Sequence, residues 1–164
     1  MVQLKAYGQA LIKTHLTVTK IVDGDGLIVQ NMFNQEEEEI RLIGIDAPEI
    51  KRTRKLLQDE RETHLPGAFL LELGGQSKQF LSTLVPVGTL VTIQMEKKHC
   101  YDTYGRTLAY VFLKDGTCVN EVMIIEGYAK PYSRYYCEAL PLLQQLHFTA
   151  KMSKVGLFNL IPSF

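Results

Sequence analysis

The stretch LTVTKIVDGDGLIVQ, residues 16–30, decides the fold of this chain. Residues 16–22 alternate polar and apolar side chains and are rich in β-branched residues, which favours a strand. The sequence DGDG at residues 23–26 is a turn signal, and an apolar run resumes at residue 27. The stretch therefore predicts two neighbouring strands joined by a tight turn that carries Asp25.

The pattern on either side of this stretch completes a small barrel. It predicts strands at residues 40–45, 90–95 and 107–113, and helices at residues 77–84, 119–127 and 142–150. Three meandering strands, a helix and two more strands are the order of a five-stranded OB barrel. We therefore expect an α+β fold, mainly β, with a five-stranded OB barrel and three principal helices.

Two polar segments are expected to lie outside this barrel. Residues 51–74 are highly charged at first and then contain Pro66 and Gly67, so we expect a surface insertion with one or two helical turns. Its basic cluster at residues 51–55 is more consistent with a solvated loop than with a site for a polyanion. The four glutamates at residues 36–39 fit a solvated hairpin tip better than a metal site, because consecutive side chains point apart.

Composition restricts the class of protein. A chain of 164 residues with 46% hydrophobic residues is expected to form one domain, residues 1–164, with a core at about 17–158. Three widely spaced cysteines argue against a disulfide framework and a zinc cluster. No apolar run is long enough to insert into a membrane, and residues 1–7 lack the apolar stretch of a secretory signal. Zero net charge argues against a broad basic face for nucleic acid.

Five charged residues lie at the ends of apolar runs, where strand ends and turns can aim them into one cleft. They are Asp25, Arg41, Asp46, Glu49 and Arg106. Three carboxylates and two guanidiniums suit a hard cation beside a phosphate. Each residue alone also has a structural explanation: a turn former, a snorkelling side chain or a strand-edge charge. Together they favour a functional site.

Three segments that carry these residues resemble the staphylococcal nuclease (thermonuclease) family. They are VDGD at 22–25, RLIGIDAPE at 41–49 and DTYGR at 102–106, the last followed by LAY at 108–110. The similarity extends from about residue 17 to residue 158, and three motifs in order make a specific signal.

The resemblance implies a calcium-dependent phosphodiesterase that acts on DNA and RNA with low sequence specificity and releases 3′-phosphate products. It also implies a secreted or periplasmic location. We expect a monomer. By resemblance, calcium is held by Asp25, Asp46 and the backbone carbonyl of Ala47. Glu49 acts on the attacking water, and Arg41 and Arg106 bind the scissile phosphate.

Tyrosines beside these motifs are candidates for stacking on bases. By resemblance, Tyr104 lies near the nucleotide, together with Tyr135 or, because the register is open, Tyr132. Tyr136 fits packing equally well. Gly26 follows Asp25 where the family has a threonine. We expect this difference to loosen the outer coordination shell of calcium. The rival functions are a related module that binds nucleic acid or protein without cleaving, and a plain oligonucleotide-binding OB protein.

Overall fold

The structure, a computed structural model, describes residues 10–164. The segment at residues 1–7, where no secretory signal was expected, lies outside the described residues. In chain order the elements are β1 (Ala10–Asp23), β2 (Gly26–Asn31), β3 (Glu37–Leu42), β4 (Ile45–Asp46), α1 (Arg54–Thr63), α2 (Gly67–Leu84), β5 (Leu90–Glu96), β6 (Thr107–Leu113), α3 (Val119–Ile125), β7 (Lys130–Pro131), α4 (Leu140–Ser153) and η1 (Gly156–Asn159).

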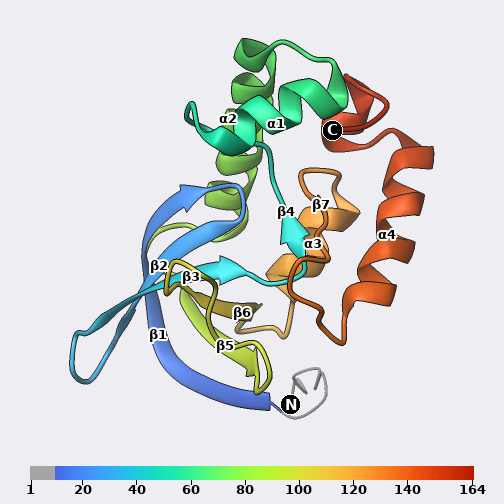
Figure 1. Cartoon of the computed structure of the whole chain (residues 1–164). Helices are drawn as coiled ribbons and strands as arrows, with labels where there is room; N and C mark the ends of the chain where they lie inside the picture. Colours follow the sequence, from blue (N-terminus) through green and yellow to red (C-terminus); the bar gives the residue numbers. More distant parts are fainter. Residues whose placement is uncertain (1–9) are drawn as a thin grey trace.

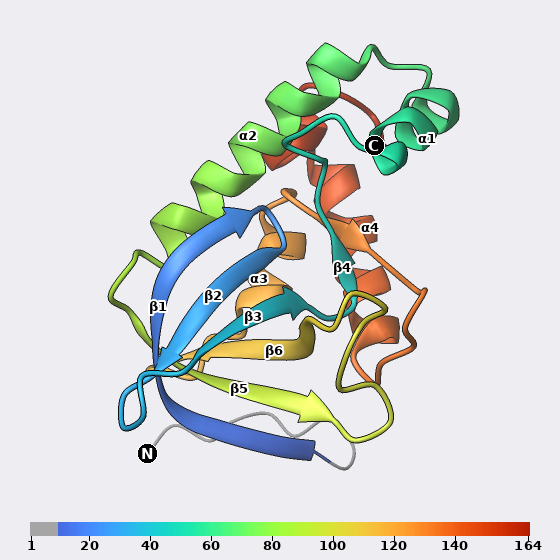
Figure 2. The same cartoon turned by 60° about the vertical axis from the view of Figure 1, so that its left-hand side comes forward.

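Five strands close into a barrel in the spatial order β1-β2-β3-β6-β5 (Figures 1 and 2). Neighbouring strands are antiparallel except β3 and β6, which are parallel. The long β1 pairs with β2 through residues 16–23 and with β5 through residues 10–17, so one strand closes the barrel. The expected α+β class, with a five-stranded barrel, is confirmed.

Alternating apolar side chains from the strands fill the barrel. Val18, Leu27, Val29 and Ile93 are fully buried, as is Tyr110 of β6. Residues 107–112 of β6 are buried on both faces, because α3 packs on the outside of this strand. The strand expected at residues 107–113 therefore coincides with β6.

The strand expected at residues 40–45 is broken in the structure. β3 ends at Leu42, and Gly44 adopts a φ of +81°, which L side chains rarely reach. A Cβ at Gly44 would also lie 2.7 Å from Cδ1 of Leu143. The chain turns here, and β4 pairs with β7 instead of continuing the barrel. This turn carries Asp46 back towards the end of the barrel.

Residues 51–74 contain more helix than the one or two turns that were expected there. The segment contains α1 and the first eight residues of α2, so the fold has four α-helices rather than three principal ones. Leu56, Leu70 and Leu73 are buried there in a second small core with Leu157 and Ile161. The contacts that order this segment come from nearly 100 residues further along the chain.

The helices lie at one end and along one side of the barrel. In Figure 1, α1 and α2 lie beyond the β1–β2 turn, while α4 runs along the side and the C-terminus ends near α1. α3 lies between α4 and β6 and contacts both of them. β4 lies between the barrel and α1, and it is here that the site forms (Figure 2). In the part of the chain that the structure describes, no helix is both long and apolar enough to span a membrane.

The second core predicts that α2 is integral to stability. Leu73→Ala removes a fully buried side chain and should lower the free energy of unfolding by about 2–5 kcal/mol. Urea denaturation followed by circular dichroism measures the change. Leu57→Ala is the control, because Leu57 is 50% exposed on the neighbouring helix. A loss for Leu73→Ala no larger than that of the control would contradict the assignment.

Candidate active site

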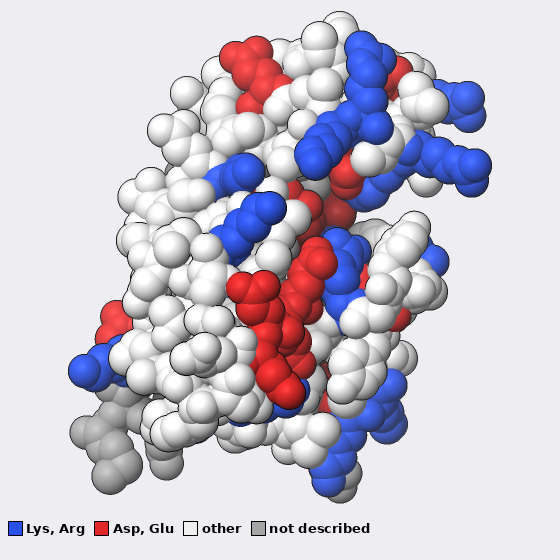
Figure 3. Space-filling model, turned by 90° about the vertical axis from the view of Figure 1, so that its left-hand side faces the viewer, with Lys and Arg blue, Asp and Glu red and all other residues white. Residues whose placement is uncertain are grey.

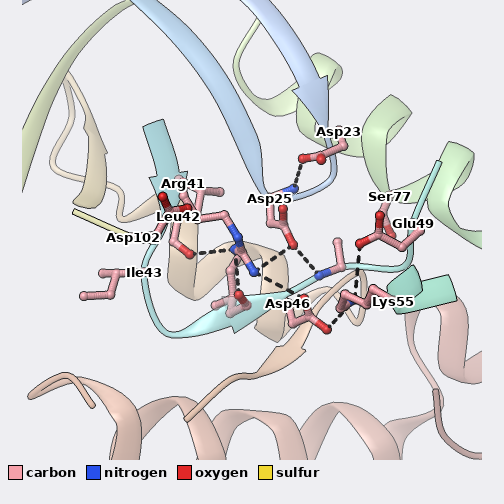
Figure 4. Close-up of polar contacts among 12 residues, drawn as sticks. Asp23, Asp25, Arg41, Leu42, Ile43, Asp46, Glu49, Lys55, Ser77 and Asp102 are labelled. Atoms are coloured by element: carbon pink, nitrogen blue, oxygen red, sulfur yellow. Dashed lines mark hydrogen bonds and ion pairs between the residues drawn. The ribbon is translucent and has the colours of Figure 1, made fainter. Parts of the chain in front are cut away.

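A buried guanidinium joins two carboxylates at the end of the barrel. Arg41, in β3, places Nη2 3.3 Å from Oδ2 of Asp25 and 3.2 Å from Oδ1 of Asp46 (Figure 4). Asp25 comes from the β1–β2 turn and Asp46 from β4. All three residues are less than 9% exposed. The structure therefore brings together three of the residues that the sequence singled out.

The other donors of Arg41 fix the chain that carries Asp46. Nη1 donates to the carbonyl oxygens of Leu42 at 3.0 Å and Ile45 at 2.8 Å. Burial alone would lower the pKa of Arg41, but the charges of Asp25 and Asp46 raise it above its ordinary value. The guanidinium is therefore charged, and it holds the turn at residues 42–46 in place.

The two carboxylates are held close together in a site with little water. Oδ2 of Asp25 accepts a 2.7 Å hydrogen bond from the backbone N–H of Ala47. Burial raises the pKa of Asp25 to about 6, and Asp23 adds to this effect while Arg41 opposes it. Burial and the charge of Asp25 also raise the pKa of Asp46, against Lys55 and Arg41. A cation bound here would offset both the cost of burying the two charged carboxylates and the repulsion between them.

Glu49 lies in the turn after β4 and is linked to Asp46 by a lysine. Oε1 of Glu49 lies 3.3 Å from Nζ of Lys55, and Oε2 accepts a 3.2 Å hydrogen bond from Oγ1 of Thr53. The same Nζ lies 3.0 Å from Oδ2 of Asp46. Burial alone would lower the pKa of Lys55, but the surrounding carboxylates, Asp46 first, raise it. Glu49 therefore lies beside the buried site without contacting Arg41.

A close backbone approach holds the turn at Glu49. A Cβ at Gly74 of α2 would overlap the carbonyl group of Glu49. Only glycine lets the helix pack directly on this turn. The turn at residues 46–49 is therefore fixed between the barrel and α2.

Arg106 occupies another wall of the same cleft. Its Nε lies 2.7 Å from Oδ2 of Asp102, and its backbone N–H donates to Oδ1 of Asp102 at 2.9 Å. Oδ1 also accepts from the backbone N–H of Tyr104 at 2.9 Å. Burial alone would raise the pKa of Asp102, but these hydrogen bonds and the charge of Arg106 lower it. Asp102 therefore anchors the turn that presents Arg106.

Three tyrosines line this cleft. Tyr132 lies beside Arg41, with the ring centroid 5.6 Å from Cζ, and Tyr104 is 82% exposed beside Arg106. The hydroxyl of Tyr135 accepts a 3.1 Å hydrogen bond from the backbone N–H of Thr103. Tyr132 and Tyr135 both line the cleft, so both stay candidates for stacking on a base. Tyr136 is not among the lining residues.

The cleft has a volume of about 790 Å³ and contains nearly equal numbers of acidic and basic side chains. The acidic residues are Asp23, Asp25, Asp46, Glu49, Asp59, Glu62 and Asp102, and the basic residues are Arg41, Arg54, Lys55, Arg106, Lys130 and Arg134. Figure 3 shows a similar mixture on one face of the molecule, without a continuous basic surface. The cleft alone therefore offers a polyanion no net positive charge.

The sequence analysis missed several contributors to the cleft, and three of them belong to α1 or its cap. Thr53 caps α1 by accepting from the backbone N–H of Leu56, while Lys55 and Asp59 form an i, i+4 pair on its cleft side. The basic cluster at residues 51–55 was expected to be solvated, and Lys55 departs from this because its side chain is only 32% exposed. The one signal was Thr53, which is a good helix N-cap residue.

The donors at this site suit a hard cation better than a soft one. Asp25 and Asp46 provide carboxylate oxygens from two segments of the chain, and Ala47, whose backbone N–H donates to Asp25, directly follows Asp46. Among residues 10–164 no group of three or more His, Cys, Asp or Glu side chains is placed to hold a metal. A cation here thus needs backbone or solvent oxygens besides the two carboxylates.

Comparison with known proteins gives consistent matches. Residues 39–160 match the family described as "Staphylococcal nuclease homologue". The chain is 30% identical over 148 residues to "Uncharacterized protein MJ1439" of Methanocaldococcus jannaschii, covering 87% of this chain and 70% of that protein. It is 31% identical to an "Uncharacterized endonuclease" of Escherichia coli, covering 88% and 77%. It is 30% identical to "Endonuclease YhcR" of Bacillus subtilis, covering 87% of this chain but 11% of that protein.

The anchor at Asp102 predicts a pH-dependent contribution to stability. Asp102→Asn should lower the free energy of unfolding by roughly 1–3 kcal/mol at pH 7. Because folding lowers the pKa of Asp102, its contribution is present above its unfolded pKa of about 3.9 and disappears as pH falls through the folded value. Urea denaturation of both proteins at pH 7 and pH 3 measures the difference.

Asp115→Asn is the matched control, because Asp115 caps a turn through Thr117 and has no arginine partner among residues 10–164. The effect of Asp102→Asn should exceed that of the control, and by more at pH 7 than at pH 3. An excess that stays constant between the two pH values would show that the charge of Asp102 is not what holds the turn.

Proposed function

The chain belongs to the staphylococcal nuclease family, and on that premise we propose that it is a calcium-dependent phosphodiesterase with low sequence specificity. Its substrates would be DNA and RNA, and its products would carry a 3′-phosphate. Nuclease activity is supported by the relatives named endonucleases, at about 30% identity over most of this chain. Calcium and the 3′-phosphate come from the family resemblance and are part of the proposal.

One observation carries the proposal. Arg41 lies between Asp25 and Asp46 in a cleft that also contains Glu49 and Arg106. Phosphodiester hydrolysis needs a site for a cation, a proton acceptor and hydrogen-bond donors to the phosphate oxygens. The two aspartates, Glu49 and the two guanidiniums can provide these in turn. A plain oligonucleotide-binding barrel needs no such carboxylate set.

Asp25, Asp46 and the carbonyl of Ala47 would hold calcium. When bound, calcium would supply positive charge and a water of lowered pKa. The pKa values of both aspartates stay raised despite Arg41 and Lys55, so further positive charge would favour their ionised forms, which supports this assignment. The mixed charge of the cleft supports it further, because a divalent ion would tip the balance towards an anionic substrate.

The protein's own side chains would divide the remaining tasks. Arg41 and Arg106 would grip the scissile phosphate, and both are pre-positioned by carboxylate partners, which limits the entropy lost on binding. Glu49 would accept the proton of the attacking water. The exposed ring of Tyr104, with Tyr132 and Tyr135, offers stacking surfaces that tolerate any base.

A second candidate is a module that binds nucleic acid or protein without cleaving it. The observation that favours it is that both proposed metal ligands already have cationic partners: Arg41 contacts Asp25 and Asp46, and Lys55 contacts Asp46. Such a module would bind an oligonucleotide equally well with and without calcium and would leave it intact.

Removing the base tests the role of Glu49. Glu49→Gln keeps the shape of the side chain but cannot accept a proton, so kcat on single-stranded DNA should fall by about 10²–10⁴-fold. Steady-state kinetics with calcium measures the change, and circular dichroism checks the fold. Glu37→Gln is the control, because Glu37 is exposed on β3 outside the cleft. Turnover by Glu49→Gln within a few-fold of the unaltered protein would refute the assignment.

Removing the metal tests the calcium requirement. Excess chelator should abolish cleavage of single-stranded DNA and RNA, and added calcium should restore it, because Asp25 and Asp46 need a cation to attract the phosphate. Gel electrophoresis follows the substrate, and end-group analysis reports whether the products carry a 3′-phosphate. Undiminished cleavage in chelator would exclude the metal role, and binding without cleavage under all conditions would favour the second candidate.

A further inference from the structure

One ammonium group lies among three carboxylates at the edge of the cleft. Nζ of Lys55 lies 3.0 Å from Oδ2 of Asp46, 3.3 Å from Oε1 of Glu49 and 3.4 Å from Oδ2 of Asp59. Its side chain is 32% exposed, so these contacts are only partly screened by water. The family motifs that the sequence displayed do not include this residue.

The fold fixes the position of this ammonium. Lys55 is the second residue of α1, directly after the N-cap Thr53 and Arg54. The next residue, Leu56, is 1% exposed in the second core and holds α1 against α2. Asp59 lies one turn later on the same helix, where it faces Lys55. The start of α1 is therefore anchored independently of the cleft.

We propose that Lys55 is a positioning residue that ties the base Glu49 to the metal ligand Asp46. The inference rests on the proposed function, because it assigns Lys55 a role through those two residues. Figure 4 shows Lys55 between Asp46 and Glu49, on the side away from Arg41. The arrangement makes α1 a part of the catalytic site rather than a surface addition.

Two contacts from α1 restrain Glu49. Lys55 holds Oε1, and Oγ1 of Thr53 donates to Oε2, so each carboxylate oxygen has its own partner. Without the ammonium, Glu49 and Asp46 are two like charges three residues apart, and repulsion favours rotamers of Glu49 that turn away. A base displaced by about 1 Å can lose about 10²-fold in rate.

The same contact must weaken the binding of a metal. Lys55 shares Asp46 with any cation bound there, and its positive charge repels that cation. Removal of the charge should therefore have two opposite effects: tighter calcium binding and slower turnover. A purely structural role for Lys55 would weaken both, so the opposite signs identify a positioning role.

The test compares variants of the full chain. Lys55→Met removes the charge while keeping the length of the side chain, and Lys55→Arg restores a cation that can reach the same carboxylates. Lys51→Met is the matched control, because Lys51 is exposed on the same segment and makes no ion pair within residues 10–164. Calorimetry with calcium alone gives the affinity, kinetics on a short single-stranded DNA gives kcat and KM, and thermal denaturation checks the fold.

For Lys55→Met we expect kcat to fall about 10- to 100-fold with KM within about threefold, and calcium to bind roughly tenfold more tightly. Lys55→Arg should recover most of kcat, and Lys51→Met should match the unaltered protein. Should Lys55→Met fail to fold, Asp59→Asn serves instead. Without the carboxylate of Asp59, the ammonium of Lys55 interacts more strongly with Asp46. Calcium binding should therefore weaken a few-fold.

Three results would overturn the inference. They are an unchanged kcat in Lys55→Met, a loss of kcat together with weaker calcium binding, and unaltered calcium binding in Asp59→Asn where that variant is needed. Failure of the proposed function has a different signature, because the unaltered protein would then not cleave in calcium at all. The calcium titrations would still report on Lys55 in that case.

Discussion

The contact of one buried guanidinium with two buried carboxylates is the constraint on which the site depends. Arg41 contacts Asp25 from the first turn and Asp46 from the short β4, and it also binds the carbonyl groups of Leu42 and Ile45. Loss of Arg41 would leave the buried carboxylate of Asp25 without its cationic partner and Asp46 with Lys55 alone, a costly state in the interior. The chain therefore has to leave the barrel at Gly44 and return, and that return builds the cleft.

The charge balance of the cleft connects this constraint to function. The cationic groups are largely committed to carboxylates: Arg41 to Asp25 and Asp46, and Arg106 to Asp102. Such pairs hold the guanidiniums in fixed positions but leave little net field for a polyanion. A bound divalent cation is the simplest addition that would give the cleft an excess of positive charge. The neutral chain thus points to a local, metal-assisted site rather than to a basic binding face.

The sequence predicted local features well and distant contacts poorly. A run that is apolar on both faces located β6 correctly, and charges at strand ends identified Asp25, Arg41 and Asp46, which do meet. The ordered helices within residues 51–74 were missed, because dense charge concealed the few apolar positions. Their burial depends on Leu157, about 100 residues further along the chain, which no local pattern reveals. Lys55 was consequently assigned to solvent.

A crystal structure of the protein with calcium and a short single-stranded oligonucleotide tests the central claim most directly. The account predicts one calcium ion ligated by Asp25 and Asp46, with a phosphate of the oligonucleotide beside Arg41 and Arg106. Calcium bound elsewhere, or the oligonucleotide lying outside the cleft while Arg41 still bridges the two aspartates, would contradict it.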